Sequence, residues 1–415
     1  MALIVHKYGG TSMGSTDRIK NVAARVAKWH DAGHRIVVVP SAMSGETNRL
    51  IGLAKEIMAQ PDPRELDMIA STGEQVSVGL LAMALLARGK DAVSYTGWQV
   101  GIRTDSAFTK ARIQSIDDSR VRADLDAGKI VIITGFQGVD DEGNISTLGR
   151  GGSDTSAVAI AAALKADECL IYTDVDGVYT TDPRVVPKAR RLDKIAFEDM
   201  LELASLGAKV LQVRSVELGM VHNMPVFVRS SFDKPEDIDP HGTPPGTLIC
   251  SEEEIMESHV VTGIAFSKDE AQISLRQIED KPGVAAAIFG PLADANINVD
   301  MIVQNVSEDG RTTDLTFTVP ASEYNRARDT IASSKGKIGY ARLDSATDVS
   351  KVSVIGSGMR SHAGVAAKAF KALSERNINI RAITTSEIKF SVLIDAAYTE
   401  LAVRTLHTLY GLDQA

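Results

Sequence analysis

The sequence predicts an α/β protein: a three-layer αβα domain with a mainly parallel sheet, followed by two small ferredoxin-like (βαββαβ) units. The first part of this prediction comes from residues 1–235, where short β-branched apolar runs alternate with amphipathic helical stretches. Continuous apolar runs of this kind are typical of parallel strands that are covered on both faces. The second part comes from an internal repeat in the C-terminal region, because two copies of one segment imply two domains of the same kind.

Composition places the chain among multi-domain globular proteins. Its 415 residues suffice for two or three domains, and 44% hydrophobic with 24% charged residues is ordinary for that class. A net charge of −9 provides no basic field for nucleic acid or an anionic membrane. Two cysteines, Cys169 and Cys250, are too few for a disulfide framework or a cysteine-built zinc site. The longest apolar stretch is about half a membrane span and no signal-like segment opens the chain, so we expect a cytoplasmic protein.

The elements of the first domain follow in order. Strands are expected at 3–5, 36–39, 130–133, 170–172 and 226–228. Between the first two lies an amphipathic helix, because Ile19, Val22, Val26 and Trp29 form one stripe at helical spacing, and Gly33 then ends it. Further helices are expected over 74–88, 153–166 and 198–211. The proline- and glycine-rich stretch 233–247 indicates a linker, which we place at 236–255.

The repeat begins at Gly283 (GVAAAIFGPLADANIN) and again at Gly364 (GVAAKAFKALSERNIN), with nine identical positions. Each copy is preceded by a strand-like run (272–275 and 351–355) and followed by another (314–319 and 389–394). Strand, helix, strand, strand is most of a ferredoxin-like unit. Two such units can pack on each other and create sites between them.

The first motif suited to a chemical role is KYGGTS at 7–12, directly after the first strand. Its glycines let backbone N–H groups approach an anion, and Lys7 adds positive charge for a phosphoryl group. It is not a Walker A loop, because the lysine precedes the glycines. The alternative is an ordinary glycine turn with a solvated lysine.

The second motif is TLGRGGSDTS at 147–156, which opens an alanine-rich helix. It combines an anion-binding backbone with Arg150, which can hold a carboxylate or a phosphate through two hydrogen bonds. Asp154 could be merely a first-turn acid that favours the helix. The density of glycines around an arginine favours a binding site.

The remaining motifs are weaker. TDVDGVYTTDPR at 173–184 lies at a strand end, where ligands bind in open α/β sheets. It lacks the later ligands of a calcium loop, and a solvated turn is its alternative. SAMSGET at 41–47 is a small polar loop suited to a substrate, and Glu74 is either a first-turn acid or a ligand for a cationic group. Lys209 is either a phosphate contact or a surface lysine. The stretch VSVIGSG at 352–358 resembles the start of a dinucleotide-binding fingerprint. Ser361 stands where the third glycine belongs, so a dinucleotide cofactor is not expected.

Taken together, these motifs make the chain resemble a monofunctional aspartate kinase of the amino-acid kinase superfamily, and its repeats resemble ACT domains. The resemblance covers essentially the whole chain. It implies an amino-acid kinase domain over 1–235, a first ACT domain over 267–340, and a second built from 256–266 plus 341–415. One ACT unit is inserted in the other in this family, so residues 260–266 are expected to pair with the second unit.

The resemblance implies transfer of the γ-phosphoryl group of MgATP to the β-carboxylate of L-aspartate. The product, 4-phospho-L-aspartate, leads to lysine, threonine, methionine and diaminopimelate. Lys7 and Asp154 would be catalytic. The substrate would contact Ser41, Thr47, Glu74, Arg150, Gly151 and Ser153. ATP would contact Lys7, Tyr8, Gly9, Gly10, Thr173, Asp174, Tyr179, Asp182, Arg184, Lys209 and Val210. No metal site on the protein is implied, because ATP oxygens and water can hold Mg²⁺.

The ACT pair would be a sensor for L-lysine and L-threonine. The first effector site would use Asp280, Lys281, Pro282, Gly283, Val284, Ala285, Asn298, Val299, Asp300 and Gln304. The second would use Val365, Ala366, Asn379, Ile380, Ser386 and Glu387. The loop before the second repeat is two residues longer than that before the first, so the two sites are expected to differ in ligand or strength. A homodimer through the ACT domains is expected, or an α2β2 assembly if a small subunit starts internally near Met256.

Three other interpretations compete with this one. A different superfamily member, acting on glutamate, acetylglutamate, carbamate or a nucleotide, is disfavoured by the paired ACT repeats. A fused homoserine dehydrogenase is not expected, because the dinucleotide fingerprint is missing. A catalytically silent amino-acid sensor would not need Lys7, Glu74, Arg150 and Asp154 together, and ATP turnover separates it from a kinase.

Overall fold

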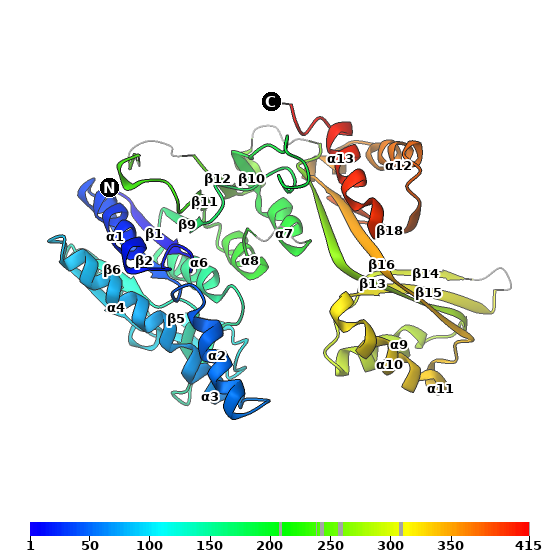
Figure 1. Ribbon diagram of the computed structural model, residues 1–415, viewed down its shortest axis with the longest axis horizontal. Helices are drawn as coiled ribbons and strands as arrows, with labels where there is room; N and C mark the ends of the chain where they lie inside the picture. Colours follow the sequence, from blue (N-terminus) through cyan, green and yellow to red (C-terminus); the bar gives the residue numbers. More distant parts are fainter. Residues whose placement is uncertain (207–209, 238, 241–244, 256–259, 307–309, 415) are drawn as a thin grey trace. The chain divides into compact units, whose positions relative to one another are not determined.

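The computed structural model describes the chain except for residues 207–209, 238, 241–244, 256–259, 307–309 and 415. The chain divides into two compact units, each with its own sheet and core (Figure 1). The first unit comprises Met1–Val178, Arg191–Ala204 and Lys209–Met256. The second comprises Tyr179–Arg190, Ser205–Ala208 and Glu257–Ala415.

An eight-stranded sheet forms the centre of the first unit. Its strands, in spatial order, are β10 (Lys194–Ala196), β12 (Thr247–Cys250), β11 (Val226–Ser230), β9 (Glu168–Thr173), β1 (Leu3–Tyr8), β2 (Arg35–Pro40), β6 (Ile130–Ile133) and β3 (Ala92–Tyr95). All neighbours are parallel except β11 and β12. The central strands β1, β2 and β6 are buried almost throughout, which explains their continuous apolar sequences. All five strands expected from the sequence are present.

Helices cover both faces of this sheet, which makes the three layers that the sequence predicts. α1 (Thr16–Asp31) and α4 (Thr72–Leu86) pack on one face, in a core that includes Ile4 and Tyr8 of β1. Side chains alternate along a strand, so Lys7 points to the other face, where it meets α6 (Gly152–Leu164). Ser15 caps α1 by accepting a hydrogen bond from the backbone N–H of Arg18.

The other elements before residue 260 surround this sheet. The helices are α2 (Glu46–Ile57), α3 (Pro63–Ala70), α5 (Ser119–Asp126), α7 (Phe197–Ser205) and α8 (Val213–Val221), with 3-10 turns η1 (Gly97–Val100), η2 (Pro235–Asp237) and η3 (Glu252–Glu254). A small sheet has the order β5 (Ile113–Ile116), β4 (Ile102–Thr104), β7 (Gln137–Val139) and β8 (Ile145–Thr147). The stretch Pro63–Leu86 is long and apolar enough to cross a membrane, but half of it is buried inside the protein, as in a core helix.

Three expectations differ from the structure. The helix expected over 198–211 is only Phe197–Ser205, and a separate helix begins at Val213; a glycine at position 207 weakens a continuous helix. Thr247–Cys250, expected in the linker, forms β12, because its apolar sequence TLIC completes the sheet beside β11. Tyr179–Arg190, expected in the first domain, belongs to the second unit, where Val185 and Val186 are buried in its core.

A six-stranded antiparallel sheet forms the centre of the second unit. Its strands, in spatial order, are β14 (Asp300–Val306), β15 (Thr312–Val319), β13 (Gly263–Glu279), β16 (Arg342–Ile355), β18 (Lys389–Asp395) and β17 (Ile380–Thr385). The helices are α9 (Val284–Asp294), α10 (Tyr324–Ser333), α11 (Lys335–Ile338), α12 (Val365–Glu375) and α13 (Thr399–Leu409), with 3-10 turns η4 (Ala321–Glu323), η5 (Ser357–Ser361) and η6 (Ala396–Tyr398). α9 and α10 belong to a core with the first repeat, and α12 and α13 to a core with the second.

The two repeats share their long central strands β13 and β16 (Figure 1). The second half of β13 belongs to the first repeat, whereas its first half, from Gly263 to Ser267, pairs with Ile355 to Lys351 of the second. The sequence expectation that residues 260–266 pair with the second unit is therefore confirmed for the paired positions. The first repeat has the strand order 4-1-3-2 of a ferredoxin-like unit. The second has the same spatial arrangement, but its fourth strand is the first half of β13, which precedes the others in the chain.

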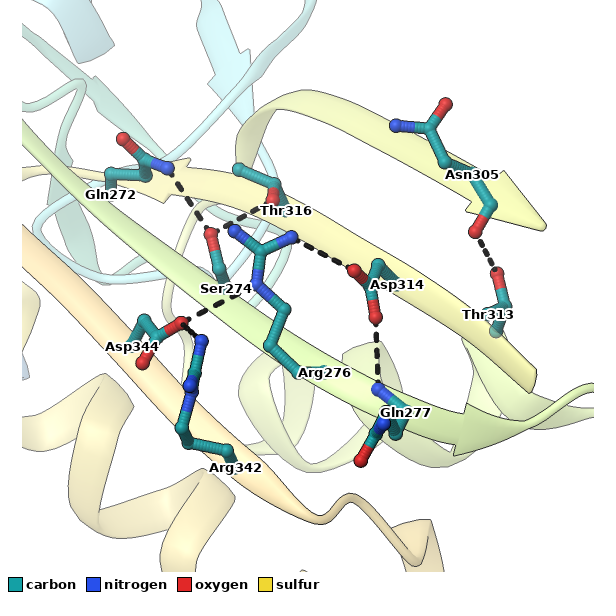
Figure 2. A network of polar contacts seen from close by, with 10 residues as sticks. All are labelled: Gln272, Ser274, Arg276, Gln277, Asn305, Thr313, Asp314, Thr316, Arg342 and Asp344. Atoms are coloured by element: carbon teal, nitrogen blue, oxygen red, sulfur yellow. Dashed lines mark hydrogen bonds and ion pairs between the residues drawn. The ribbon is translucent and has the colours of Figure 1, made fainter. Parts of the chain in front are cut away.

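One face of the first repeat's sheet carries a polar network (Figure 2). Arg276 of β13 donates to Asp314 of β15 at 3.0 Å and to Asp344 of β16 at 3.4 Å. Arg342 donates to the same Asp344 at 2.8 Å. Apolar side chains such as Ile273 alternate with these and enter the core on the opposite face. The network therefore connects three strands on the half-exposed face.

Candidate active site

The candidate active site lies at the carboxyl ends of three central parallel strands, β9, β1 and β2. Tyr8, the last residue of β1, is in register with Pro40 of β2 and Tyr172 of β9. The following loops leave the sheet side by side: the N–H of Ser41 bonds to the Tyr8 carbonyl at 2.9 Å, and that of Gly9 to the Tyr172 carbonyl at 3.3 Å. Open α/β sheets bind ligands at such a position, where the connections that follow two adjacent strands run in opposite directions.

Lys7 and Asp154 form a buried ion pair at this edge. Lys7 is the penultimate residue of β1, and Asp154 lies in the first turn of α6. Lys7 Nζ is 2.5 Å from Asp154 Oδ1, although the contact lacks the alignment of a hydrogen bond. Both residues are 8% exposed. The positive partial charge at the start of α6 and the Lys7 ammonium together favour an anion here.

The glycine-rich loop before α6 depends on backbone conformations that favour glycine. Gly149 and Gly151 have φ of +77° and +71°. A Cβ atom on Gly151 would lie 1.7 Å from Cγ of Gln212, so a larger residue would have to displace the Gln212 side chain. Arg150, between them, is exposed and forms no ion pair with any residue that the structure describes. The loop thus presents a guanidinium that has no ion-pair partner among the described residues.

Glu74 is a buried carboxylate with one free oxygen. It lies in the first turn of α4 and is 3% exposed. Its Oε1 accepts the N–H of Ala42 at 3.1 Å, while Oε2 has no hydrogen-bond partner in the described part of the chain. Burial raises the pKa of Glu74 to about 7, against the opposing effect of backbone hydrogen bonds. A cationic ligand group at Oε2 would satisfy this carboxylate.

The other expected substrate residues flank the same loops. Ser41 begins the loop after β2, Thr47 lies in the first turn of α2, and both are half-buried. Gly151 and Ser153 lie at the start of α6.

The expected nucleotide residues divide between the two units. The first unit contains Lys7, Tyr8, Gly9, Gly10, Thr173, Asp174 and Val210. The hydroxyl of Thr173, at the end of β9, donates to Asp174 at 3.1 Å. Tyr179, Asp182 and Arg184 belong to the second unit, where Asp182 and Arg184 form an ion pair at 2.7 Å. Lys209 lies outside the described residues. The described residues contain no cluster of three or more potential metal ligands.

Two residues near the glycine-rich loop were missed by the sequence analysis. Asp67 of α3 is 1% exposed and accepts hydrogen bonds from Thr109 and Thr147. Arg214 of α8 donates to the carbonyls of Leu148, at 2.7 Å, and Ala111, at 3.0 Å. The available signal for Asp67 was an acid between the apolar residues Leu66 and Met68, because a buried acid requires polar partners.

The expected effector residues all lie in the second unit. Asp280, Lys281, Pro282, Gly283, Val284 and Ala285 lie at the passage from β13 to α9, and Asn298, Val299, Asp300 and Gln304 lie before or within β14. Asp300 is ion-paired with Lys351 of β16.

The expected second effector site is divided between two hollows. Val365, Ala366, Ser386 and Glu387 line one hollow of about 190 Å³, together with Lys389. Asn379 and Ile380 line a different one, beside Phe370, Ser374, Asn377 and Ile378.

Comparison with known proteins decides the family. Residues 2–230 match the amino acid kinase family, and residues 272–334 and 352–410 each match an ACT domain. The aspartokinase of Pseudomonas aeruginosa is 60% identical over 100% of this chain and 98% of its own. The chain belongs to the aspartokinases. It is therefore an aspartate kinase, a phosphotransferase with a carboxyl group as acceptor.

Solved aspartokinases share the whole architecture. E. coli aspartokinase III in complex with aspartate and ADP (R-state) superposes with a TM-score of 0.79 at 27% identity, over 98% of this chain and 99% of its own. The same E. coli enzyme in complex with lysine and aspartate (T-state) has a TM-score of 0.78 at 27% identity, over 99% of both chains. The predicted kinase domain and two ACT domains are thus confirmed as the fold of this aspartokinase.

Proposed function

We propose that this aspartokinase transfers the γ-phosphoryl group of MgATP to the β-carboxylate of L-aspartate, giving 4-phospho-L-aspartate in the cytoplasm. The observation that carries the proposal is Lys7 Nζ, held 2.5 Å from Asp154 where β1 ends, beside the start of α6. The complex of E. coli aspartokinase III with aspartate and ADP supports the same pair of ligands. The reaction opens the biosynthesis of lysine, threonine, methionine and diaminopimelate.

The proposed mechanism needs positive charge rather than a general base. A carboxylate is already a nucleophile near pH 7, so the barrier lies in bringing two anions together. Lys7 neutralises charge on the transferring phosphoryl group, and the backbone of Gly9 and Gly10 lies beside it. Asp154 orients Lys7. Mg²⁺ arrives with ATP and keeps mainly ATP oxygens and water as ligands.

Substrate recognition follows from the free polar groups of the site. Arg150 binds the α-carboxylate of aspartate, since its guanidinium is unpaired among the described residues and can form two hydrogen bonds. Glu74 Oε2 accepts from the α-ammonium. Ser41 and Thr47 hold the reacting carboxylate, and the loop around Gly151 and Ser153 completes the site. ATP contacts the residues that follow β1 and β9 in the first unit.

An acyl-phosphate trap tests this function. The purified protein is incubated with MgATP, hydroxylamine and either L-aspartate or L-glutamate, and hydroxamate is measured. We expect hydroxamate with aspartate and not with glutamate. No hydroxamate from protein shown to be folded by its melting curve would reject the proposal and favour a silent sensor.

Aspartate binding is expected to depend on the ionisation of Glu74. Its pKa of about 7 means that half of the free enzyme carries a protonated Glu74 near that pH. Only the ionised form binds an ammonium group well, so kcat/KM for aspartate is expected to fall about tenfold per pH unit below that pKa and to level off above it. The measurement is a pH profile of kcat/KM for aspartate between about pH 5.5 and 9.

The control for this profile is Glu74→Gln, whose neutral amide does not titrate. We expect a lower kcat/KM for aspartate that no longer falls around pH 7. A Glu74→Gln profile with the same inflection as the parent would show that another group titrates.

Feedback inhibition by lysine, threonine or both is proposed to act through the ACT repeats. The hollow beside the second repeat supports a zwitterionic ligand, because Lys389 and Glu387 offer opposite charges on its wall. The lysine complex of E. coli aspartokinase III supports lysine as one effector. The trap is repeated with each amino acid singly and together, and the inhibition pattern identifies the effectors. A homodimer through the ACT domains, or an α2β2 assembly, is distinguished by intact mass and native mass spectrometry.

A further inference from the structure

Asp67 connects three parts of the first unit that are far apart in the sequence. It lies on α3 and is 1% exposed. Its Oδ2 accepts the N–H of Thr109 at 2.8 Å and the N–H of Thr147 at 2.7 Å, and its Oδ1 accepts the Thr147 hydroxyl at 2.6 Å. Thr147 ends β8, two residues before the glycine-rich loop. Asp67 therefore holds both the root of that loop and the segment beside it.

The segment beside the loop is strained. Thr109 has φ of +67°, which is rare and unfavourable for a β-branched residue. Its carbonyl oxygen would lie 2.9 Å from a Cβ atom on Gly149, so the two backbones are in close contact. Strain of this kind persists only where surrounding contacts hold it. The Asp67 carboxylate, bonded to the N–H of Thr109, is one such contact.

Asp67 also lies close in sequence to Glu74. α3 ends at Ala70, and α4, with Glu74 in its first turn, begins at Thr72. Another hydrogen bond connects this junction to the β7–β8 hairpin, because the side chain of Gln137 donates to the Ser71 carbonyl at 2.8 Å. The junction of α3 and α4 is thereby tied to the hairpin that leads into the glycine-rich loop.

We propose that Asp67 is a positioning residue for aspartate, because its hydrogen bonds to Thr109 and Thr147 set the separation of Glu74 from Arg150. These two groups recognise the α-ammonium and the α-carboxylate of one small substrate, so an error in their spacing weakens both contacts together. The hydrogen bonds of Asp67 go to Thr109 and Thr147 and to none of the described nucleotide residues after β1 and β9. The inference rests on the proposed roles of Glu74 and Arg150.

Steady-state kinetics of the full chain test the inference. Asp67→Ala is expected to raise KM for aspartate roughly 10- to 100-fold, because small displacements of binding groups have effects of this order. KM for ATP should stay within about threefold. Asp67→Asn should remain near the parent enzyme, since its amide oxygen can accept both N–H groups while its NH₂ donates to the Thr147 hydroxyl. A role in stability alone would not produce this difference between the two Michaelis constants.

Two control variants separate the possible outcomes. Asp124→Ala removes a half-buried carboxylate that accepts from Tyr95 at 2.6 Å and Lys129 at 2.9 Å, and it should leave KM for aspartate unchanged. Arg150→Ala should raise KM for aspartate. If Arg150→Ala has no effect, the proposed function of the loop fails. If it raises KM but folded Asp67→Ala does not, only the present inference fails.

Two further results would also overturn the inference. Equal losses in Asp67→Ala and Asp67→Asn would show that charge, not hydrogen bonding, matters. If Asp67→Ala does not fold, Thr147→Val replaces it, because it removes only the hydroxyl bond to Asp67. A KM for aspartate in folded Thr147→Val that equals the parent value would then count against the inference.

Discussion

Lys7→Ala is expected to lower kcat for phosphoryl transfer to aspartate by about 10³-fold or more. The ammonium of Lys7 is the positive charge that lies closest to Asp154, where β1 and α6 meet. Removal of one preorganised charged donor from a phosphoryl-transfer site has effects of this size. The measurement is kcat from the hydroxamate assay at saturating MgATP and aspartate. The melting temperature must show that the variant is folded, because Asp154 loses its buried partner.

Lys20→Ala is the matched control for this variant. Lys20 pairs with Asp17 on α1 with its side chain 67% exposed, so its removal should leave kcat unchanged. Lys7→Arg tests geometry, because it retains a charge on a longer, planar group and should recover only part of the activity. A kcat for folded Lys7→Ala within tenfold of the parent would remove Lys7 from the mechanism.

Lys351→Met is expected to destabilise the second unit by about 3–5 kcal/mol, the usual effect of leaving a buried charge unpaired. Lys351 Nζ lies 3.0 Å from Glu270 and also pairs with Asp300, and the side chains of Lys351 and Glu270 are each 7% exposed. Burial alone would lower the pKa of Lys351, but these two carboxylates outweigh it and raise the pKa above its ordinary value. The measurement is hydrogen exchange of the β13 and β16 amides in the full chain.

Arg276→Met serves as the control within the same sheet. Arg276 also contacts two carboxylates, but its side chain is 37% exposed, so its loss should change stability by no more than about 1 kcal/mol. The double variant Lys351→Met/Glu270→Leu removes both buried charges and should recover much of the stability. Similar losses in Lys351→Met and Arg276→Met would contradict the importance of burial.

The fold could be predicted largely from local patterns. β1, β2 and β6 are covered on both faces, so their continuous apolar runs identify them without reference to any partner. The stripe from Ile19 to Trp29 identifies α1 in the same way. Tyr179–Arg190 could not be assigned, because it follows β9 directly in the chain and only the burial of Val185 and Val186 places it in the second unit.

The residues of the candidate site also fall into those that local sequence patterns predict and those that only tertiary contacts reveal. The sequence by itself predicts Lys7, Arg150, Asp154 and their glycine loops as candidates, because each motif is formed by neighbouring residues whose backbone chemistry already favours an anion. It also determined the two ACT repeats, through their identical positions. Only the tertiary structure decided that Asp67 supports the loop, since its partner Thr147 lies 80 positions away. It likewise decided that one buried lysine, Lys351, joins the repeats. Contacts between distant positions leave no periodicity in the sequence, and they form only when packing brings the two chain segments together.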